Sequence, residues 1–540
     1  MSLHVLRGVP QKKLSRAFLV RRWLVALCFI VSALQSAFFV YALVTDGDAE
    51  GAYLYHGWLA VTGQISLYQD EMTGHRVALP YYVLGLSQVL WGPSLIAARA
   101  VSAAIGLGAL VLLWRLATRL GGELCGALAA LFALTQAYLV GYFAWATFHG
   151  LISFLLLATL YSLLATDLRF RRVLTMGFCT LLFFTRPQIW PLQPLALAFL
   201  LWEAESRLER WAITAVAVGP PAAFFLSDVS HLKLLASIPG LSRLVAPLGF
   251  QAVAVPYRYE HDWGPAVAGA IGLLARSYKT WTVAGAVLLA VLGWRVARGR
   301  PVRQFFANRG VVIVAAIVLY LAAWQFVIIR FSLKTAVGYF PSFAILTAIP
   351  LGWGFSVLLR SAEAVPARRA VVGALLVGLF LVSPVVSPPP PLPLAVAYDR
   401  PPMVALQEVV AALRSLIPSG SRVFLFGPSE TLYMAGLHPY LQQANHLETL
   451  SPVPDDWIRR RSGLWGDAEI REWLGRDADY AVVRLAILRA ARENQHTPSG
   501  NNVDLIESLL SRHFRVVAVL DQYPGPPFSV YKRTSSARDS

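Results

Sequence analysis

Three carboxylates, Asp46, Asp48 and Glu50, lie within five residues directly after the first long apolar run of the chain. Carboxylates crowded at a membrane boundary repel one another and are costly to remove from water, so they require a cation, a basic partner or a proton. Such a group can act as a general base on an acceptor hydroxyl or amine, or hold a divalent metal ion. The alternative is structural, because Asp48 and Glu50 also suit the N-terminal cap and first turn of a following helix.

Four basic residues are candidates for binding an anion on the same side of the membrane: Arg76, Arg186, Arg330 and Lys334. Arg330 and Lys334 are four residues apart and would share a helical face, although snorkelling to the interface explains them equally well. Arg186 precedes a helix-breaking proline between strongly apolar segments, where an arginine indicates function. His149 begins an apolar run and is a candidate for proton transfer or ligand binding, although a lone histidine there is more often an interfacial residue.

The composition predicts that membrane-spanning helices position these residues. Of the 540 residues, 56% are hydrophobic and 14% are charged, and the mean hydropathy is +0.56, which is typical of multi-span membrane proteins. A net charge of +17 would suggest a nucleic-acid partner for a soluble protein. Here most arginines lie in short loops between apolar runs, so we expect membrane lipids as the surroundings and no nucleic acid.

About eleven apolar runs are candidates for membrane-spanning helices once their flanks are included. The first run follows a basic stretch and is longer than the core of a signal peptide, which predicts an anchor with a cytoplasmic N-terminus. Arginines then concentrate in alternate loops, as cytoplasmic loops require. The Thr185-Arg186-Pro187 break is either a loop between two spans or a kink within one. The predicted spans are 23–44, 95–116, 124–143, 150–165, 173–185, 189–201, 212–226, 281–294, 311–329, 336–358 and 370–386.

The end of the chain differs in pattern from the membrane part. Five prolines between Ser387 and Pro393 cannot continue a helix and predict a stiff linker. Alternating helix-like and strand-like stretches follow, with strands predicted at 422–426, 480–483, 514–520 and 528–531, so we expect a soluble α/β domain. The predicted organisation is a transmembrane domain at 1–387 with an outer-face loop at 46–93, a linker at 388–400 and an outer-face α/β domain at 401–540.

The segment after the first apolar run resembles the first outer loop of the GT-C glycosyltransferases, in particular the protein mannosyltransferase and aminoarabinose transferase group. The resemblance rests on Asp48-Ala49-Glu50-Gly51-Ala52-Tyr53-Leu54-Tyr55, Gly63-Gln64, Leu67-Tyr68-Gln69-Asp70 and Pro80-Tyr81-Tyr82. The Thr185-Arg186-Pro187 break and the strand-like segments of the C-terminal part extend it over nearly the whole chain. Where the family usually has adjacent Asp-Glu, this chain has Asp48-Ala49-Glu50, so the base remains open among Asp48, Asp46 and Glu50.

The resemblance implies a polytopic α-helical membrane protein of GT-C-like fold that carries out an inverting sugar transfer. The donor would be a polyprenyl-phosphate sugar and the acceptor a lipid, polysaccharide or protein, at the outer face of a bacterial inner membrane. Tyr68, Asp70 and His149 would then bind substrate. The four basic candidates would neutralise the lipid phosphate as it leaves. No cofactor is certain, and a divalent metal ion is a further candidate.

Two other classes of protein remain alternatives. A transporter or flippase of lipid-linked glycans would favour inverted repeats and charges near the bilayer midplane, whereas here the charges gather at one boundary. A non-catalytic assembly subunit would have no need of the carboxylates between Asp46 and Glu50. An acidic group at the outer membrane boundary with an arginine opposite it favours the enzyme.

Overall fold

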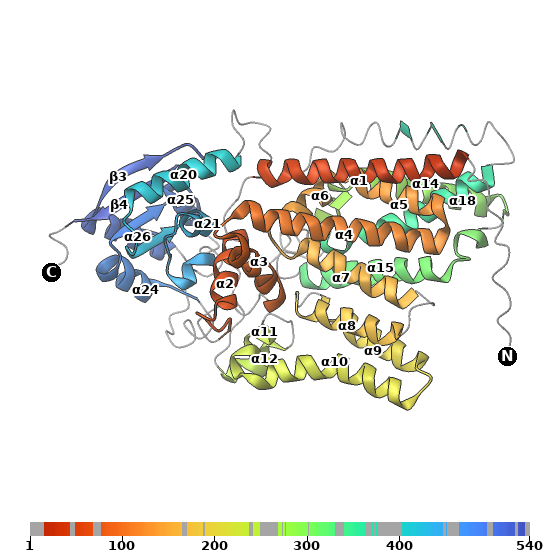
Figure 1. The fold of residues 1–540 in the computed structure, drawn as a ribbon, viewed down its shortest axis with the longest axis horizontal. Coiled ribbons are helices and arrows are strands. Elements are labelled where there is room, and N and C mark those ends of the chain that lie inside the picture. Colours follow the sequence, from red (N-terminus) through yellow and green to blue (C-terminus); the bar gives the residue numbers. More distant parts are fainter. Residues whose placement is uncertain are drawn as a thin grey trace, which may run out of the picture.

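In the computed structural model, the long helices of the membrane part run along the longest axis of the molecule, and the strands lie at one end of it (Figure 1). The structure describes residues 16–43, 49–68, 77–164, 170–186, 189–236, 241–248, 268–269, 271–272, 274–275, 277–300, 302–329, 340–362, 370, 373–374, 377–378, 402–445, 450, 464–493, 500–523 and 527–534. The predicted linker at 388–400 and most of the span predicted at 370–386 lie outside these residues.

The first ten predicted spans coincide with helices, and the loop between the first two spans contains two more, α2 and α3. Helices form here because apolar side chains leave the backbone polar groups to be satisfied within each segment. The helices of the membrane part are α1 (Arg16–Ala42), α2 (Ala49–Val61), α3 (Ala78–Trp91), α4 (Leu95–Gly121), α5 (Glu123–Leu134), α6 (Ala137–Ala144), α7 (His149–Leu164), α8 (Arg171–Phe183), α9 (Leu192–Glu203), α10 (Arg207–Ser227), α11 (Lys233–Ala236), α12 (Ser242–Val245), α14 (Lys279–Ala297), α15 (Arg309–Ile329), α17 (Pro341–Ala344) and α18 (Ala348–Ala362).

Several of these helices are long and apolar enough to cross a membrane. Among the described residues, four helical stretches are long and apolar enough to span a membrane. A fifth span exists if α10 and the short helices that follow it form one segment with a bend of 112°. The four stretches are Arg22–Ala42, Leu95–Gly121, Lys279–Ala297 and Pro341–Ser361. The chain therefore has the helices of a multi-pass membrane protein, while the full count of about eleven stays a prediction.

One face of α1 shows directly which medium this fold requires. Large apolar side chains recur along it every three or four residues, and each of them is at least half exposed. An apolar strip of this length would promote aggregation in water, whereas lipid tails solvate it. The side chains of the strip are Trp23, Leu27, Ile30, Leu34, Phe38 and Tyr41.

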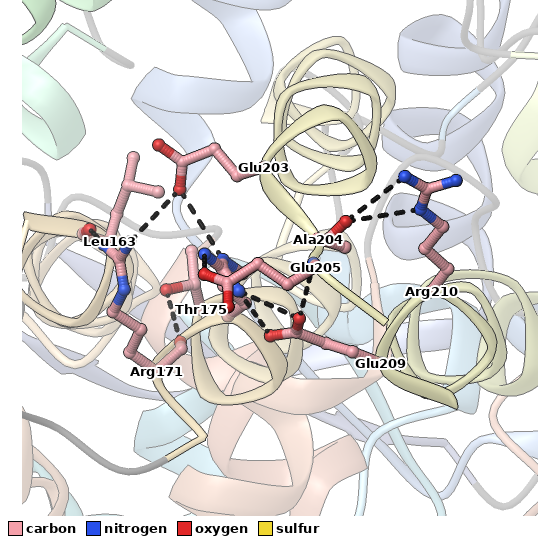
Figure 2. Close-up of polar contacts among 9 residues, drawn as sticks. Leu163, Arg171, Thr175, Glu203, Ala204, Glu205, Glu209 and Arg210 are labelled. Atoms are coloured by element: carbon pink, nitrogen blue, oxygen red, sulfur yellow. Dashed lines mark hydrogen bonds and ion pairs between the residues drawn. The ribbon is translucent and has the colours of Figure 1, made fainter. Parts of the chain in front are cut away.

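The break between α8 and α9 is a turn between antiparallel helices and not a kink. Arg171, the first residue of α8, has its Nη2 3.4 Å from Oε2 of Glu203, the last residue of α9 (Figure 2). Because the start of one helix lies beside the end of the next, the chain reverses direction between Phe183 and Leu192. Arg186 thus lies at a turn, at the end of the helix pair opposite to Arg171.

Antiparallel packing gathers the basic loops at one end of the helix bundle, which we call the basic end. Arg119 at the end of α4 donates to the Tyr161 hydroxyl near the end of α7 (3.3 Å), and Arg171 donates to the carbonyl of Leu163 (2.9 Å). Arg360 near the end of α18 donates to the Gly121 carbonyl. Loops that the positive-inside rule assigns to one side of a membrane therefore meet at one end of the structure.

Arg172 anchors a partly buried charge cluster at the basic end, which joins α8, α9 and α10. Figure 2 shows its acidic members Glu203, Glu205 and Glu209. Its side chain is 13% exposed and lies 2.9 Å from Glu209, 3.0 Å from Glu205 and 3.7 Å from Glu203. Glu205 is 84% exposed, so water screens that pair, and most of the stabilisation comes from the other two.

We expect Arg172→Met, which keeps the length of the side chain but removes its donors, to lower the free energy of unfolding by ~1–3 kcal/mol. Thermal unfolding of the detergent-solubilised protein measures this loss. Arg119→Met is the control, because that arginine is exposed and its hydrogen bond to Tyr161 is long, at 3.3 Å. Equal stability of the Arg172 variant and wild type would show that the cluster does not hold these helices together.

The residues 402–534, here called the C-terminal region, contain a four-stranded sheet in the order β1-β2-β4-β3. β1 and β2 are parallel, and both other pairs are antiparallel. All four strands lie where the sequence predicts them, since turn residues and short runs of β-branched and aromatic residues mark them clearly. The elements are α20 (Pro402–Leu416), β1 (Val423–Phe426), α21 (Ser429–Met434), α24 (Asp467–Glu472), β2 (Tyr480–Val483), α25 (Leu485–Glu493), α26 (Gly500–His513), β3 (Phe514–Leu520) and β4 (Phe528–Arg533).

The two faces of β1 belong to two different hydrophobic cores. Val423 and Leu425 join the core that continues through α20 and α21 into the membrane helices. Phe424 and Phe426 point to the other face and join a core made with α24 and α26. Successive side chains of a strand alternate between faces, so a four-residue strand can serve both. The C-terminal region is thereby packed against the membrane helices through a continuous buried contact.

Candidate functional site

The site lies at the end of the bundle opposite the basic end, where α1, α6 and α8 finish and α2, α4 and α7 begin; we call this the site end. Glu50, the second residue of α2, is buried there with an exposed fraction of 2%. Its Oε1 accepts from Arg99 Nε (2.8 Å) and from the backbone N–H of Ala146 (2.9 Å). Its Oε2 accepts from Arg99 Nη2 (2.6 Å). Glu50 therefore forms a bidentate ion pair that is also bonded to the link between α6 and α7.

Arg99 fixes the chain on both sides of the predicted acidic segment. It is fully buried near the start of α4, and its Nη1 donates to the carbonyls of Val40 (3.1 Å) and Leu43 (2.9 Å). Those carbonyls end α1, whereas Glu50 begins α2. A planar guanidinium with five donors can make these contacts together, which a lysine could not. The residues between Leu43 and Ala49, which include Asp46 and Asp48, lie outside the described residues.

This geometry suits Glu50 for positioning better than for proton transfer. Both oxygens of its carboxylate already accept hydrogen bonds, from Arg99 and from the Ala146 N–H, so they are directed at the protein and not at an acceptor. Glu50 was one of three candidates for the base, and no contact tests that role directly. Arg99 was not among the predicted site residues, although an arginine four residues into an apolar run is itself a signal of function.

Arg186 and His149 come together at the same end. Arg186 is 6% exposed, and its guanidinium carbon lies 4.0 Å from the centroid of the Phe148 ring. His149, the first residue of α7, is also buried, and its Nδ1 hydrogen-bonds with the Ser342 hydroxyl at 2.9 Å. The His149 ring further stacks on Trp145 at 6.3 Å. A guanidinium over an aromatic face keeps its charge while the ring fixes its position.

The segment from Trp145 to Phe148 connects these two groups of contacts. It is not helical, so the backbone N–H of Ala146 is available to Glu50, and Phe148 lies under Arg186. Phe148 also contacts Tyr53 of α2, with ring centroids 6.3 Å apart. The structure thus brings three predicted site residues, Glu50, His149 and Arg186, around one short link.

Tyr68 lies in a neighbouring contact between the loop after α2 and the end of α10. Its carbonyl accepts from Lys233 Nζ (2.7 Å), and its ring packs edge-on against Phe224 and His231. Burial raises the pKa of the Tyr68 phenol well above its usual value, and the nearby phenols of Tyr81, Tyr82 and Tyr53 raise it further. Tyr68 is therefore protonated at physiological pH and able to donate a hydrogen bond.

The structure also identifies a basic residue that the sequence reasoning missed. Lys233 is 5% exposed and lies on the same side as the site, where a cation can meet a lipid phosphate. Its signal was present, since it is a lysine within the short apolar stretch Leu232–Ala236 of a predicted outer loop. Arg76, Asp70, Arg330 and Lys334 lie outside the described residues and stay predictions.

A divalent metal ion is a further candidate for the site. Among the described residues, no three His, Cys, Asp or Glu residues are arranged to hold one. Asp46 and Asp48 lie outside that search, so a divalent ion on these two aspartates stays a prediction.

Comparisons with known proteins find the fold but no sequence relative. No protein-family model and no curated protein matches the chain. The structure is similar to that of ArnT from Cupriavidus metallidurans bound to undecaprenyl phosphate, with a TM-score of 0.56 and 13% identity over 97% of this chain and 99% of that chain. It is also similar to the oligosaccharyltransferase AglB from Archaeoglobus fulgidus in complex with an inhibitory peptide and a dolichol-phosphate, with a TM-score of 0.50 and 12% identity over 96% of this chain and 75% of that chain.

The apo form of the Archaeoglobus fulgidus oligosaccharyltransferase gives the same result, with a TM-score of 0.50 and 11% identity over 97% of this chain and 75% of that chain. Similarity at this level of identity establishes a shared arrangement of helices and strands and carries no residue-by-residue correspondence. The match extends over nearly the whole chain and includes both the membrane helices and the C-terminal region. The chain therefore has the GT-C fold that the motifs of its first outer loop predicted.

Proposed function

We propose that this chain is an integral membrane glycosyltransferase that moves a sugar from a polyprenyl-phosphate donor to a lipid, polysaccharide or protein acceptor. The observation that carries the proposal is that buried Arg186 and buried Glu50 lie around the same short link, Trp145 to Phe148, at the end of the bundle away from the basic loops. A guanidinium at a membrane boundary is suited to neutralise a departing lipid phosphate. The full-length likeness to a structure holding undecaprenyl phosphate supports the same reading.

The proposed reaction is a single displacement at the anomeric carbon. The acceptor oxygen or nitrogen forms a bond to that carbon while the bond to the phosphate oxygen breaks, which inverts the configuration. The acceptor loses its proton to a carboxylate, and the lipid phosphate leaves as an anion beside arginine. Asp48 is the preferred base and Asp46 the alternative, because the carboxylate of Glu50 is already paired with Arg99.

The positive-inside rule orients this proposal in the membrane. The basic end would face the cytoplasm, so the site end and the C-terminal region would lie at the outer face, as in a periplasm. Chain connectivity keeps the Cα atom of Asp48 within ~7 Å of that of Glu50 whatever the backbone does between them. The base would therefore work at the outer boundary of the membrane, where lipid-linked donors present their sugars.

Purified protein with undecaprenyl-phosphate sugars and total membrane lipid as acceptor tests the function. Release of free undecaprenyl phosphate together with glycosylated lipid supports transfer. Movement of intact donor across a proteoliposome membrane without release would favour a flippase instead. Because a hexose and an aminopentose pose different demands on a binding site, both kinds of donor belong in the assay.

We expect Arg186→Ala to reduce donor use by about 10–100-fold, the value of one charge-assisted contact to a phosphate. The loss should appear in kcat/KM for the donor, and Arg186→Lys should restore part of it. Arg119→Ala, at the basic end, is the matched control and should leave turnover unchanged. Wild-type turnover by Arg186→Ala would remove Arg186 from the donor site.

A further inference from the structure

The C-terminal region places two residues directly against the start of α2. Ser429 and Glu430 begin α21, just after β1, and are 1% and 0% exposed. The Ser429 hydroxyl donates to the carbonyl of Ala444 (3.0 Å), which fixes its position within the C-terminal region. The proposed function uses neither residue, yet a buried glutamate is costly unless its surroundings favour the charge or the proton.

Gly51 shows how close this contact is. A Cβ atom at Gly51 would lie 2.1 Å from Ser429 Oγ, 2.5 Å from Glu430 Oε2 and 2.6 Å from the backbone nitrogen of Glu430. These distances are far below any normal carbon contact, and one of the three atoms is backbone that cannot rotate away. The residue after Glu50 is therefore a glycine that lets the Glu430 carboxylate approach the backbone of α2.

The charges at this contact form one connected group. Arg99 is paired with Glu50, and the Glu430 carboxylate lies close to Gly51, the residue after Glu50. Carboxylates from α2 and from the C-terminal region therefore lie at the same turn of the chain.

Aromatic contacts hold the C-terminal region in this position. The His438 ring stacks on Trp58 (5.8 Å, 3°) and on Tyr55 (5.8 Å, 23°) of α2. His56 Nε2 lies 2.8 Å from the Leu441 carbonyl. Burial lowers the pKa of His438, so this ring is neutral and packs as an aromatic at neutral pH.

We propose that Glu430 is a positioning residue through which the C-terminal region completes the sugar-transfer site. Its carboxylate packs against the backbone of α2 at Gly51 and adds a negative charge at the first turn of that helix. A carboxylate that acts as the base close to this turn would then have a higher proton affinity while Glu430 is in place. This inference rests on the proposed function, and it adds a second part of the chain to the site.

Several titratable and charged groups lie around Glu430, and their charges affect how kcat/KM depends on pH. They are Glu50 and His56 on α2, Arg99 on α4, Arg414 on α20, Tyr433 and His438 in the C-terminal region, Tyr523 near Arg99, and Asp46 and Asp48 in sequence before α2. Removing one negative charge lowers the pKa of a neighbouring carboxylate. Glu430→Gln should therefore move the acidic limb of kcat/KM to lower pH by about one unit.

The test compares Glu430→Gln, Glu430→Asp and Gly51→Ala with wild type in the transfer assay, across pH. In Glu430→Gln we expect kcat to fall about tenfold or more and the acidic limb of the kcat/KM profile to shift to lower pH. In Glu430→Asp, which keeps the charge, that limb should stay at its wild-type position. Gly51→Ala should lose activity although every charge remains, because the added methyl displaces Glu430. Gly177→Ala, where an added Cβ meets nothing within 4 Å, is its control.

The controls separate the possible failures. Glu472→Gln, an exposed carboxylate on α24, should leave kcat and the pH profile unchanged. Wild-type kcat and an unshifted limb in folded Glu430→Gln would overturn the positioning role while leaving the proposed function intact. Absence of transfer by wild type itself, with every donor and with lipid, polysaccharide and protein acceptors, would overturn the proposed function and this inference together.

Discussion

Replacing Asp48 by Asn should lower sugar transfer by about 10²–10⁴-fold while leaving a folded, membrane-inserted protein, because a general base contributes about that factor. Asn keeps the size and most of the hydrogen bonding of Asp but cannot accept the proton of the acceptor. The measurement is transfer by purified protein at saturating donor and acceptor, so that kcat reports the chemical step. Monodispersity and the unfolding temperature check that the fold is intact.

Asp46→Asn and Glu50→Gln, assayed side by side, complete this test. Asp46→Asn should be milder if Asp48 is the base. Should Asp46 prove the critical residue, the motif is displaced by two residues in this chain and the mechanism is otherwise unchanged. If all three variants keep near-normal activity, the base does not lie in this segment and the proposed mechanism is wrong.

Arg99→Met should cause the largest loss of stability, a fall of ~3–5 kcal/mol in the free energy of unfolding, since it leaves a buried carboxylate without its partner. Arg99 is 0% exposed and Glu50 is 2% exposed, so water cannot replace the lost contacts. The variant also loses the two bonds that tie the end of α1 to α4. Thermal unfolding in detergent, with expression level as a second readout, measures the loss.

The double variant Arg99→Met with Glu50→Met separates the two contributions. Apolar residues of similar length remove both charges, so the double variant should recover part of the stability that Arg99→Met loses. Among the single variants, the loss in the free energy of unfolding should increase with the burial of the replaced arginine. It should be largest for Arg99→Met, intermediate for Arg172→Met and smallest for Arg119→Met. A double variant no more stable than Arg99→Met would show that the bonds to Val40 and Leu43 matter more than the ion pair.

These variants also distinguish positioning from catalysis. Glu50→Gln should lose activity together with stability, because its carboxylate holds Arg99 and the Ala146 N–H. Asp48→Asn should lose activity alone. The residue whose variant loses activity but keeps its stability is therefore assigned as the base, and no bound substrate is needed for this assignment.

The sequence by itself indicated a membrane protein, the positions of the four strands and of ten helical segments, and, through a family resemblance, the fold. Apolar runs of helical length and the distribution of arginines depend on local composition, so they can be read without knowing which helices touch. The four strands were predicted at their observed positions for the same reason. The motif from Asp48 to Tyr55 pointed to the GT-C fold, which the structural comparison bears out.

Tertiary structure decided which charged residues meet. Glu50 is 49 residues from its partner Arg99, and Glu430 lies far along the chain from Gly51, which it contacts. Nothing in the local spacing of either carboxylate shows that a guanidinium or a second region of the chain lies against it. The same limit left the Thr185-Arg186-Pro187 break open between a loop and a kink until the antiparallel packing of α8 and α9 settled it. Charge pairing in a low-dielectric interior depends on distances of a few ångström between segments remote in sequence, and only the folded chain sets those distances.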